Sequence, residues 1–531
     1  MKNKLFRIFD SNGYLFALLV LAALAPVFSY AARATWVFVN ITVNFAHFTT
    51  VLLCAMIANA ITAAVLTALK IYKVKKNGNA VCETKGYKVF FVLASLFTLV
   101  FTIAAVSFFS GMCHGENKEV YTLYLQKSLP LTSVFVAVLV LALFVPKMPK
   151  KAKTAVCAIV LLITAVALID NIFPLNPYKI TSEPIVFDNG GGYSVVFSTN
   201  DQGTAYIEYT YNGEDYKVFD ATGGKIHTDK RIHSMQVPYE HLKNNTYRVG
   251  TVRVIESYSY GSRLGKELIS ADYTLSVNEG ETQEYLVLSD WHTWVERAYA
   301  ATEYLGSYDA VILLGDATPG VDFEEQVISN IVQFAGELTK GAKPVLYVRG
   351  NHETRGNYAS EISDALGLDE FYFTANSGPY GFIILDSGED KDDSHPEYGG
   401  TTDYNTYRAD MIKWLSGVEM RNEKVIALSH SWHISDVEPE LSKAGWDELN
   451  RLGVRMLLSG HIHQCRLIGS TDGEKEFLSA YPDILAYADG GNSGGTFTGS
   501  KMTLSPDGIH LFAIDQNGEE KFNSHFAWIA E

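Results

Sequence analysis

The hydrophobic positions of the chain follow two different patterns. Before residue 170 they form long uninterrupted runs, and after it they recur in short runs separated by polar residues. Five long runs are close to the ~17–25 residues that a helix needs to cross a membrane. They cover residues 14–30, 47–72, 87–110, 129–145 and 154–169. We therefore expect residues 1–170 to form a transmembrane helical bundle of about five spans, with a buried core helix as the alternative for the last two runs.

Basic residues are distributed unevenly between the loops of this region. Thirteen Lys and Arg residues precede the first span or lie between the second and third and between the fourth and fifth. The other loops hold three, Arg33, Lys118 and Lys127. Because loops rich in Lys and Arg stay in the cytoplasm, we expect a multi-pass cell-membrane protein with a cytoplasmic N-terminus and an extracellular C-terminal part. Residues 1–31 also resemble a signal peptide, but cleavage there leaves the C-terminal part on the same side.

Charge and cysteine content separate the two parts further. Residues 1–177 hold 16 basic and 5 acidic residues, and the remainder holds 27 basic and 54 acidic residues. The second part therefore has a net charge of −27 and repels a phosphate backbone, so we expect no nucleic-acid binding. Only Cys465 lies beyond the spans, which excludes an internal disulfide in the outer part. This cysteine usage is typical of a bacterial surface protein.

A short linker and a strand-like segment follow the apolar region. Residues 171–178 contain two prolines and predict a stiff linker. Residues 179–280 hold runs rich in Val, Thr, Tyr and Ile that are broken by Asn-Gly and Gly-Gly pairs, a pattern typical of an antiparallel sandwich. They contain no metal-ligand spacing. We expect a β-sandwich module that acts as a spacer or shapes the substrate site.

Strand-like and helix-like runs alternate from residue 281 to residue 531. Residues 285–288, 310–314 and 345–348 predict buried strands, and residues 296–305 and 323–338 predict helices between them. This alternation predicts an α/β domain, in which ligands bind where the strands end.

Polar residues follow five of the strand-like runs, each where the run ends. In chain order they are Asp290 with His292, Asp316, Asn351 with His352 and Glu353, His430, and His461 with His463. Carboxylate and imidazole groups suit Zn, Mn, Fe or Ni, and one carboxylate can bridge two cations about 3.5–4 Å apart. Each fragment alone is more often a turn, a cap or a structural histidine. The five in order predict a site for two divalent metal ions.

These blocks resemble those of the calcineurin-like metallophosphoesterases, which are Asp-x-His, Gly-Asp, Gly-Asn-His-Asp/Glu, a lone His and Gly-His-x-His. The resemblance covers about residues 284–531 and implies an αββα sandwich with two divalent metal ions (Mn, Fe, Zn, Ni or Mg). It implies that Asp290, His292 and His463 bind one ion, that Asn351, His430 and His461 bind the other, and that Asp316 bridges them. The preceding module loosely resembles the fibronectin type III-like domain of purple acid phosphatases.

The resemblance also implies a mechanism and shows where this chain departs from its relatives. A metal-bridging hydroxide would attack phosphorus, His352 would protonate the leaving group, and Glu353 would support the ligands from behind. The purple enzymes have Gly where His292 stands and Tyr where Pro319 stands, so we expect no Fe(III)–tyrosinate centre. Many relatives orient the catalytic His with an Asp that follows the bridging one. Residues 317–319 offer none, and the residue that orients His352 stays open.

Three further residues are candidates for substrate binding. Arg349 and Arg355 flank the Asn351-His352 turn and could bind a phosphate, and His433 lies three residues after His430. An ordinary surface or supporting position is the alternative for each of them. The acidic insert at residues 388–402 predicts an exposed loop near the site, which as a lid would repel highly anionic substrates.

Two classes of function remain open from the sequence. The leading prediction is a phosphohydrolase that acts outside the membrane on a phosphomonoester or phosphodiester of a lipid, a wall polymer or a nucleotide. The alternative is a non-catalytic, metal-stabilised binding or sensing ectodomain, which the large membrane part favours and His352 opposes. A transporter is disfavoured because the spans contain almost no charge.

Overall fold

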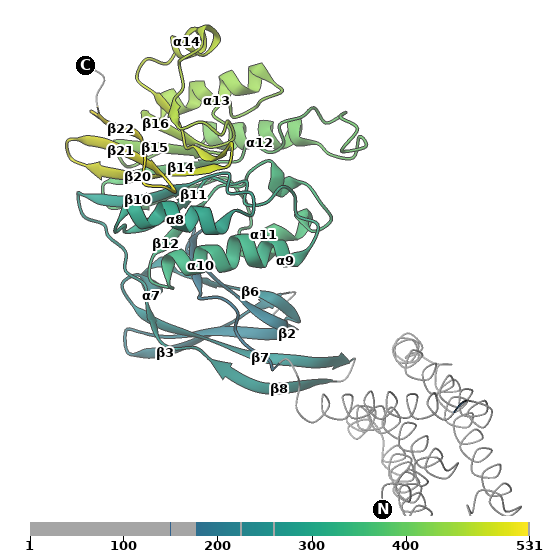
Figure 1. Ribbon diagram of the computed structural model, residues 1–531. Coiled ribbons are helices and arrows are strands. Elements are labelled where there is room, and N and C mark those ends of the chain that lie inside the picture. Colours follow the sequence, from purple (N-terminus) through teal and green to yellow (C-terminus); the bar gives the residue numbers. More distant parts are fainter. Residues whose placement is uncertain (1–148, 150–176, 223–225, 259–260, 529–531) are drawn as a thin grey trace, which may run out of the picture. The chain divides into compact units, whose positions relative to one another are not determined.

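The computed structural model describes residue 149 and residues 177–222, 226–258 and 261–528 (Figure 1). The transmembrane region predicted at 1–170 and most of the linker lie outside these residues, so the five spans stay a prediction. No helix in the described part of the chain is long and apolar enough to cross a membrane. Tyr178–Ile255 and Leu264–Glu531 form one compact unit.

Two sheets form the centre of the site-bearing domain. The first contains β10 (Gln283–Leu288), β11 (Ala310–Leu313), β12 (Pro344–Tyr347), β19 (Gly491–Ser493), β20 (Thr496–Ser505), β21 (Gly508–Asp515) and β22 (Glu520–Phe526). The second contains β13 (Phe373–Ser377), β14 (Tyr380–Leu385), β15 (Lys424–Ser429), β16 (Val454–Ser459), β17 (Arg466–Leu467) and β18 (Leu485–Ala488). Strands β10, β11 and β12 run parallel, as do β14, β15, β16 and β18. The C-terminal ends of the parallel strands in each sheet therefore lie at one edge.

Helices cover the outer face of each sheet. The first sheet carries α8 (Val295–Leu305), α9 (Glu324–Val327), the π-helical η3 (Ile328–Val332) and α10 (Gln333–Thr339), so the helix predicted at 323–338 consists of three segments. The second sheet carries α12 (Tyr404–Ser416) and α13 (Pro439–Arg451). Shorter helical segments are α7 (Tyr239–Leu242), η4 (His352–Thr354), η5 (Ala359–Glu361), α11 (Ile362–Leu366) and α14 (Asp472–Leu478).

Alternation along the strands explains the layers. Leu286 and Leu288 of β10 belong to the core shared with α8 and α10. Tyr285 and Val287, their neighbours, belong to the core shared with β14, β15 and β16. Successive side chains of a strand point to opposite faces, so a strand that is apolar at every position is buried on both. The result is helices, sheet, sheet and helices, as the predicted αββα arrangement requires.

The segment predicted as β-rich at 179–280 consists mainly of strands. They are β1 (Ile185–Asp188), β2 (Tyr193–Tyr211), β3 (Glu214–Phe219), β4 (Ala221–Thr222), β5 (Ile226–His227), β6 (Lys230–Val237), β7 (Thr246–Tyr258), β8 (Gly261–Ile269) and β9 (Tyr273–Thr274). Strand β1 pairs in parallel with β12, so all but β4 and β5 continue the first sheet. The boundary predicted at residue 281 thus falls inside one compact unit, and the fibronectin type III-like assignment stays a prediction.

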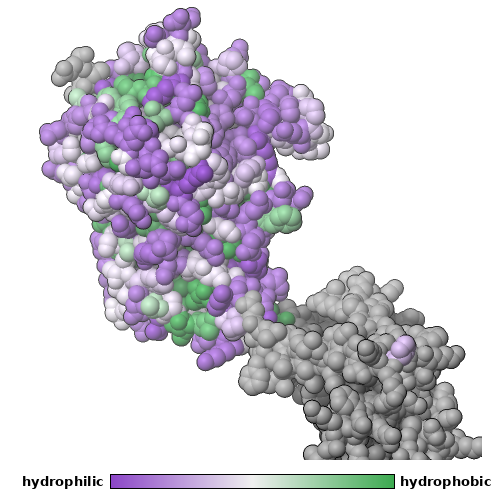
Figure 2. All heavy atoms as spheres, viewed as in Figure 1, coloured by the Kyte–Doolittle hydropathy of each residue, from purple (hydrophilic) through white to green (hydrophobic). Residues whose placement is uncertain are grey.

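The surface of the described part is mostly hydrophilic in the view of Figure 2. Its exposed large hydrophobic side chains are Phe219, Ile226, Leu264, Ile269, Tyr304 and Phe323. The first four belong to β3, β5 and β8, so the exposed apolar residues are more frequent in the β-rich segment than around the strand ends of the domain that follows it.

Candidate metal centre

The seven predicted ligands follow five parallel strands, directly beyond their C-terminal ends. Asp290 and His292 follow β10, Asp316 follows β11, Asn351 follows β12, His430 follows β15, and His461 and His463 follow β16. The structure brings the donor atoms of six of them, and those of His352, together in overlapping groups, within 4.8 Å of one another in each group. These groups are Asp290, His292 and His463; His292, Asp316 and His352; and Asp316, His430 and His461. Side chains whose residues are up to 173 positions apart in the chain, Asp290 and His463, therefore meet at one place.

The backbone at these strand ends has an unusual conformation. Five of the residues, Asp290, His292, Asp316, His461 and His463, have positive φ angles between 39° and 69°. Non-glycine residues adopt this left-handed region at a cost of about 1–2 kcal/mol each. Backbone hydrogen bonds hold the turns, since the N–H of Asp290 donates to Gly315 O (3.0 Å) and that of His292 to Asp316 O (3.1 Å). Strain of this kind is typical of functional sites.

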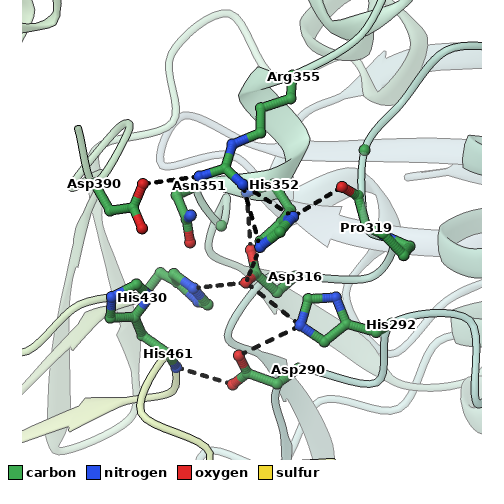
Figure 3. A network of polar contacts seen from close by, with 12 residues as sticks. Asp290, His292, Asp316, Pro319, Asn351, His352, Arg355, Asp390, His430 and His461 are labelled. Carbon is green, nitrogen blue, oxygen red and sulfur yellow. Dashed lines mark hydrogen bonds and ion pairs between the residues drawn. The ribbon is translucent and has the colours of Figure 1, made fainter. Parts of the chain in front are cut away.

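Asp316 lies at the centre of the group (Figure 3). Its Oδ2 atom is 3.2 Å from His430 Nε2, 3.7 Å from His292 Nε2 and 3.8 Å from His352 Nε2. Its Oδ1 atom accepts the backbone N–H of His352 at 3.0 Å. One carboxylate oxygen therefore faces three imidazoles.

Asp290 is the second buried carboxylate. Its Oδ2 accepts the backbone N–H of His461 at 2.9 Å. Its Oδ1 faces His463 Nε2 at 3.5 Å and His292 Nε2 at 4.0 Å. His292 thus lies between the two carboxylates (Figure 3).

Backbone carbonyls set the tautomers of three histidines. Nδ1 of His430 lies 2.6 Å from Leu314 O, Nδ1 of His463 2.6 Å from Asn492 O, and Nδ1 of His352 2.8 Å from Pro319 O. A carbonyl oxygen only accepts, so each Nδ1 carries a hydrogen and each Nε2 points toward the carboxylates. Metal-binding histidines have this arrangement, with the second nitrogen donating to a fixed acceptor.

The unpartnered atoms of the site test whether cations fit there. Asp290 Oδ1, Asn351 Oδ1 and His430 Nε2 are buried and have no hydrogen-bond partner among the described residues. All three carry lone pairs, and burying such atoms without a partner is unfavourable. Divalent cations bound by oxygen and imidazole nitrogen would satisfy all three.

The electrostatics agree with this test. Burial alone lowers the pKa of His430, but the neighbouring charge of Asp316 outweighs it and raises the pKa to about 10. The Asp316 charge therefore favours positive charge next to His430 Nε2, as a bound cation would supply.

Two glycines allow the close approach of these loops. A Cβ on Gly350 would lie 2.2 Å from Asp316 Oδ1, and one on Gly460 would lie 2.5 Å from Asp290 Oδ2. Any side chain at either position would displace a carboxylate, which explains why glycine precedes Asn351 and His461.

Glu353 supports the centre from behind, as predicted for a residue next to the ligands. It is fully buried and accepts the backbone N–H groups of Asp316 (2.9 Å), Ala317 (2.6 Å) and Gly350 (2.8 Å). Its carboxylate thereby ties the loop after β11 to the loop after β12. Burial raises its pKa to about 7.

Two groups that the sequence left unidentified hold His352. The carbonyl of Pro319 accepts from Nδ1, and Nη1 of Arg355 lies 3.4 Å from both ring nitrogens. Arg355 is in turn bound by Glu389 and Asp390 of the acidic insert. No sequence signal identifies a backbone carbonyl as the orienting group, whereas the acidic run after Gly388 marked the insert.

Arg349 and His433 make their contacts with neighbouring side chains. The guanidinium of Arg349 lies 2.6 Å from Asp386 Oδ2 and over the ring of Phe371. The imidazole of His433 lies against Trp432, with 3.6 Å between ring centroids. The structure therefore places Arg349 in a buried ion pair, and the substrate-binding roles of both residues stay predictions.

The turn at residues 489–495 is packed behind Asp290, whereas its composition predicts a flexible turn. Asp489 is fully buried and accepts the hydroxyls of Ser289 (3.1 Å) and Ser500 (2.5 Å), and burial raises its pKa to about 7. The N–H of Asn492 donates to Asp290 O at 3.1 Å. The buried carboxylate of Asp489, which sequence analysis missed, fixes the loop that carries Asp290.

The chain is similar to one protein-family model and to several solved structures. Residues 284–465 match the family model of the calcineurin-like phosphoesterases. No curated protein sequence matches the chain. The fold is similar to a structure of PhoD, with 12% identity over 66% of this chain and 94% of that chain and a TM-score of 0.38. It is also similar to GAP50, the anchor in the inner membrane complex of Plasmodium, with 14% identity over 48% of this chain and 90% of that chain and a TM-score of 0.34. A metallophosphoesterase from Sphaerobacter thermophilus is similar with 15% identity over 41% of this chain and 82% of that chain and a TM-score of 0.22. At these identities and TM-scores the structural likenesses carry no argument about activity.

Proposed function

We propose that the chain is a dimetal-dependent phosphohydrolase that cleaves a phosphomonoester or phosphodiester, because residues 284–465 match the family model of the calcineurin-like phosphoesterases. Asp290, His292 and His463 would hold one cation, Asn351, His430 and His461 would hold the other, and Asp316 would lie between them. The observation that carries this assignment is the convergence of three buried lone-pair atoms, Asp290 Oδ1, Asn351 Oδ1 and His430 Nε2, that have no partner in the described part of the chain.

The bound cations and the side chains of the protein have different roles in this mechanism. Two bound divalent cations polarise phosphoryl oxygens and lower the pKa of water, so a nucleophile is available near neutral pH. The residues of the chain hold the reacting groups in place. The Asp290 and Asp316 carboxylates and the Asn351 amide fix the geometry from three strand ends, and Glu353 keeps the loops after β11 and β12 at one spacing.

His352 is the general acid. Its Nδ1–H is fixed by Pro319 O, and its Nε2 lies 3.8 Å from Asp316 Oδ2, which places Nε2 next to the predicted metal ligands. A proton carried at Nε2 passes to the leaving oxygen as the phosphoester bond breaks. A non-catalytic metal site does not need an imidazole in this position, which favours hydrolysis over a purely sensing domain.

The domain acts on the outer face of the cell membrane. The support for this is the sequence: five apolar runs before residue 170 and thirteen basic residues in the loops assigned to the cytoplasm. The β-rich segment, as a fibronectin type III-like module, joins that anchor to the catalytic domain. The bilayer places lipid head groups, wall polymers and extracellular nucleotides within reach as substrates. Protease added to intact cells should remove the domain, and complete protection would contradict the location.

Metal-dependent hydrolysis is tested with the purified full-length chain. After chelation it should hydrolyse chromogenic mono- or diesters only when Mn, Zn or Mg is restored, and elemental analysis should find about two metal ions per chain. Asp316→Asn should abolish both readouts, and His352→Ala should lower kcat while metal content is kept. Asp322→Asn, a change at an exposed aspartate six residues away, is the matched control. An inactive metal-loaded protein, or a fully active D316N variant, would contradict the proposal.

A further inference from the structure

Arg355 joins the acidic insert to the catalytic histidine. It lies four residues after Asn351, and its guanidinium reaches His352 on one side and the insert on the other (Figure 3). On the insert side, Nε donates to Glu389 Oε2 at 2.6 Å, and Nη2 donates to Glu389 Oε1 (2.5 Å) and Asp390 Oδ1 (2.8 Å). The insert therefore holds Arg355 through three charge-assisted hydrogen bonds.

These bonds use the edge of the guanidinium that normally binds a phosphate. Arginine binds a doubly charged phosphoryl group most strongly with two parallel N–H groups. In this chain Glu389 occupies the Nε–Nη2 edge in that bidentate manner. The Nη1 group is left facing the site, 3.4 Å from the ring nitrogens of His352. It can donate to a single phosphoryl oxygen.

The charges around Nη1 disfavour a second negative charge. Arg355 brings one positive charge, and Glu389 and Asp390 bring two negative ones, so the cluster has a net charge of −1. The Glu389 side chain is 0% exposed, so solvent and salt screen it little. Lys391 lies 3.3 Å from Asp390 Oδ1 and 3.1 Å from Glu397 Oε2, so adding Lys391 and Glu397 to the cluster leaves its net charge at −1.

The fold keeps this cluster in place. The Glu389 carboxylate also accepts the hydroxyl of Thr354 at 3.2 Å. Its backbone carbonyl accepts from the buried guanidinium of Arg408 at 3.1 Å, which also binds the carbonyl of Ser387 at 3.2 Å. Glu389 is thus fixed through both its side chain and its backbone.

We propose that Glu389 is a positioning residue that reserves Arg355 for singly charged phosphoryl groups, so that the site prefers phosphodiesters to phosphomonoesters. This rests on the proposed phosphohydrolase function and narrows its substrate class. A phosphodiester carries one negative charge, whereas a phosphomonoester carries two above its second pKa of about 6.

The test compares two chromogenic substrates at pH 8.5 with the metal-loaded full-length chain. The wild type should hydrolyse bis(4-nitrophenyl) phosphate with a kcat/KM at least about tenfold above that for 4-nitrophenyl phosphate, as expected for one unscreened charge. Glu389→Gln should shift this ratio about tenfold toward the monoester, mainly through a lower KM for the monoester. The reason is that the Nε–Nη2 edge of Arg355 becomes available to bind the phosphoryl group. Asp392→Asn removes one exposed carboxylate from the same insert and should leave the ratio unchanged.

A binding measurement separates specificity from a general structural effect. Calorimetry should show inorganic phosphate, a dianion at pH 8.5, binding about tenfold more tightly to E389Q than to the wild type, with dimethyl phosphate unchanged. If E389Q does not fold, Asp390→Asn at the half-exposed partner should shift both readouts in the same direction. Wild-type preference for the monoester, or an unchanged ratio in folded E389Q and D390N, would overturn this proposal and leave the phosphohydrolase intact. Failure to hydrolyse either ester with any metal would refute the phosphohydrolase itself.

Discussion

A single methyl group at Gly350 should disable the centre without disturbing the rest of the fold. In Gly350→Ala the new Cβ would lie 2.2 Å from Asp316 Oδ1, 2.3 Å from Asp316 N and 2.6 Å from Glu353 Oε2. Ordinary contact begins at 3.4 Å, so the loop that carries Asp316 must move by about 1 Å. Overpacking of this kind costs about 1–3 kcal/mol of stability. A displacement of about 1 Å in a reacting group costs about a hundredfold in rate.

The assay measures three quantities on the same protein. We expect kcat/KM for a chromogenic diester to fall about a hundredfold, metal content to fall below that of the wild type, and the free energy of unfolding in urea to fall by about 2 kcal/mol. The control is Gly473→Ala in α14, where a Cβ meets nothing within 4 Å. It should raise stability slightly, by about 0.5–1 kcal/mol, because alanine is the better helix former. A G350A protein with wild-type metal content and activity within threefold would refute the reasoning.

Three further predictions concern the loops, the β-rich segment and the metals. Glu353→Gln keeps one acceptor oxygen for three backbone N–H groups, so the free energy of unfolding in urea should fall by about 2 kcal/mol. In the control Glu361→Gln, at an exposed site, the free energy of unfolding should stay unchanged. Burial raises the pKa of Asp188 to about 6, so the stability of the wild type should fall by about 2 kcal/mol between pH 4 and pH 7 relative to Asp188→Asn. A pH-independent difference between the two proteins in urea unfolding would contradict this. Chelation should lower the melting temperature of the wild type because bound cations stabilise only the folded state. In Asp316→Asn, scanning calorimetry should find no such difference.

The direction of the Asp188 prediction follows from its surroundings. The carboxyl group accepts the hydroxyl of Tyr239 and the N–H of Gly190 (3.0 Å), but burial outweighs both and disfavours the charged form. The folded protein therefore binds this proton more tightly than the unfolded chain, whose aspartates have a pKa near ~3.9. The resulting stability is fully present below that value and is lost as pH rises through about 6.

The sequence by itself determined the layers and the chemistry of the site. Runs such as Tyr285–Leu288 are apolar at every position, which requires a strand buried on both faces. Each polar block directly follows its strand, so the parallel pairing of β10 and β11 alone places Asp290 and Asp316 at one edge of the first sheet. These features are local in the chain: side chains alternate with period two in the strands, and the ligands lie within a few residues of a strand end. Local features of this kind can be recognised from the sequence alone.

Only the tertiary structure decided which groups hold those residues in place. Pro319 orients His352 through a backbone carbonyl, which every residue possesses and which therefore leaves no mark in a sequence. Glu389 binds Arg355 across 34 positions of the chain. The same holds for β1, whose pairing with β12 joins the β-rich segment to the catalytic sheet. Such contacts depend on how distant segments meet, because hydrogen bonding and burial act through space and not along the chain.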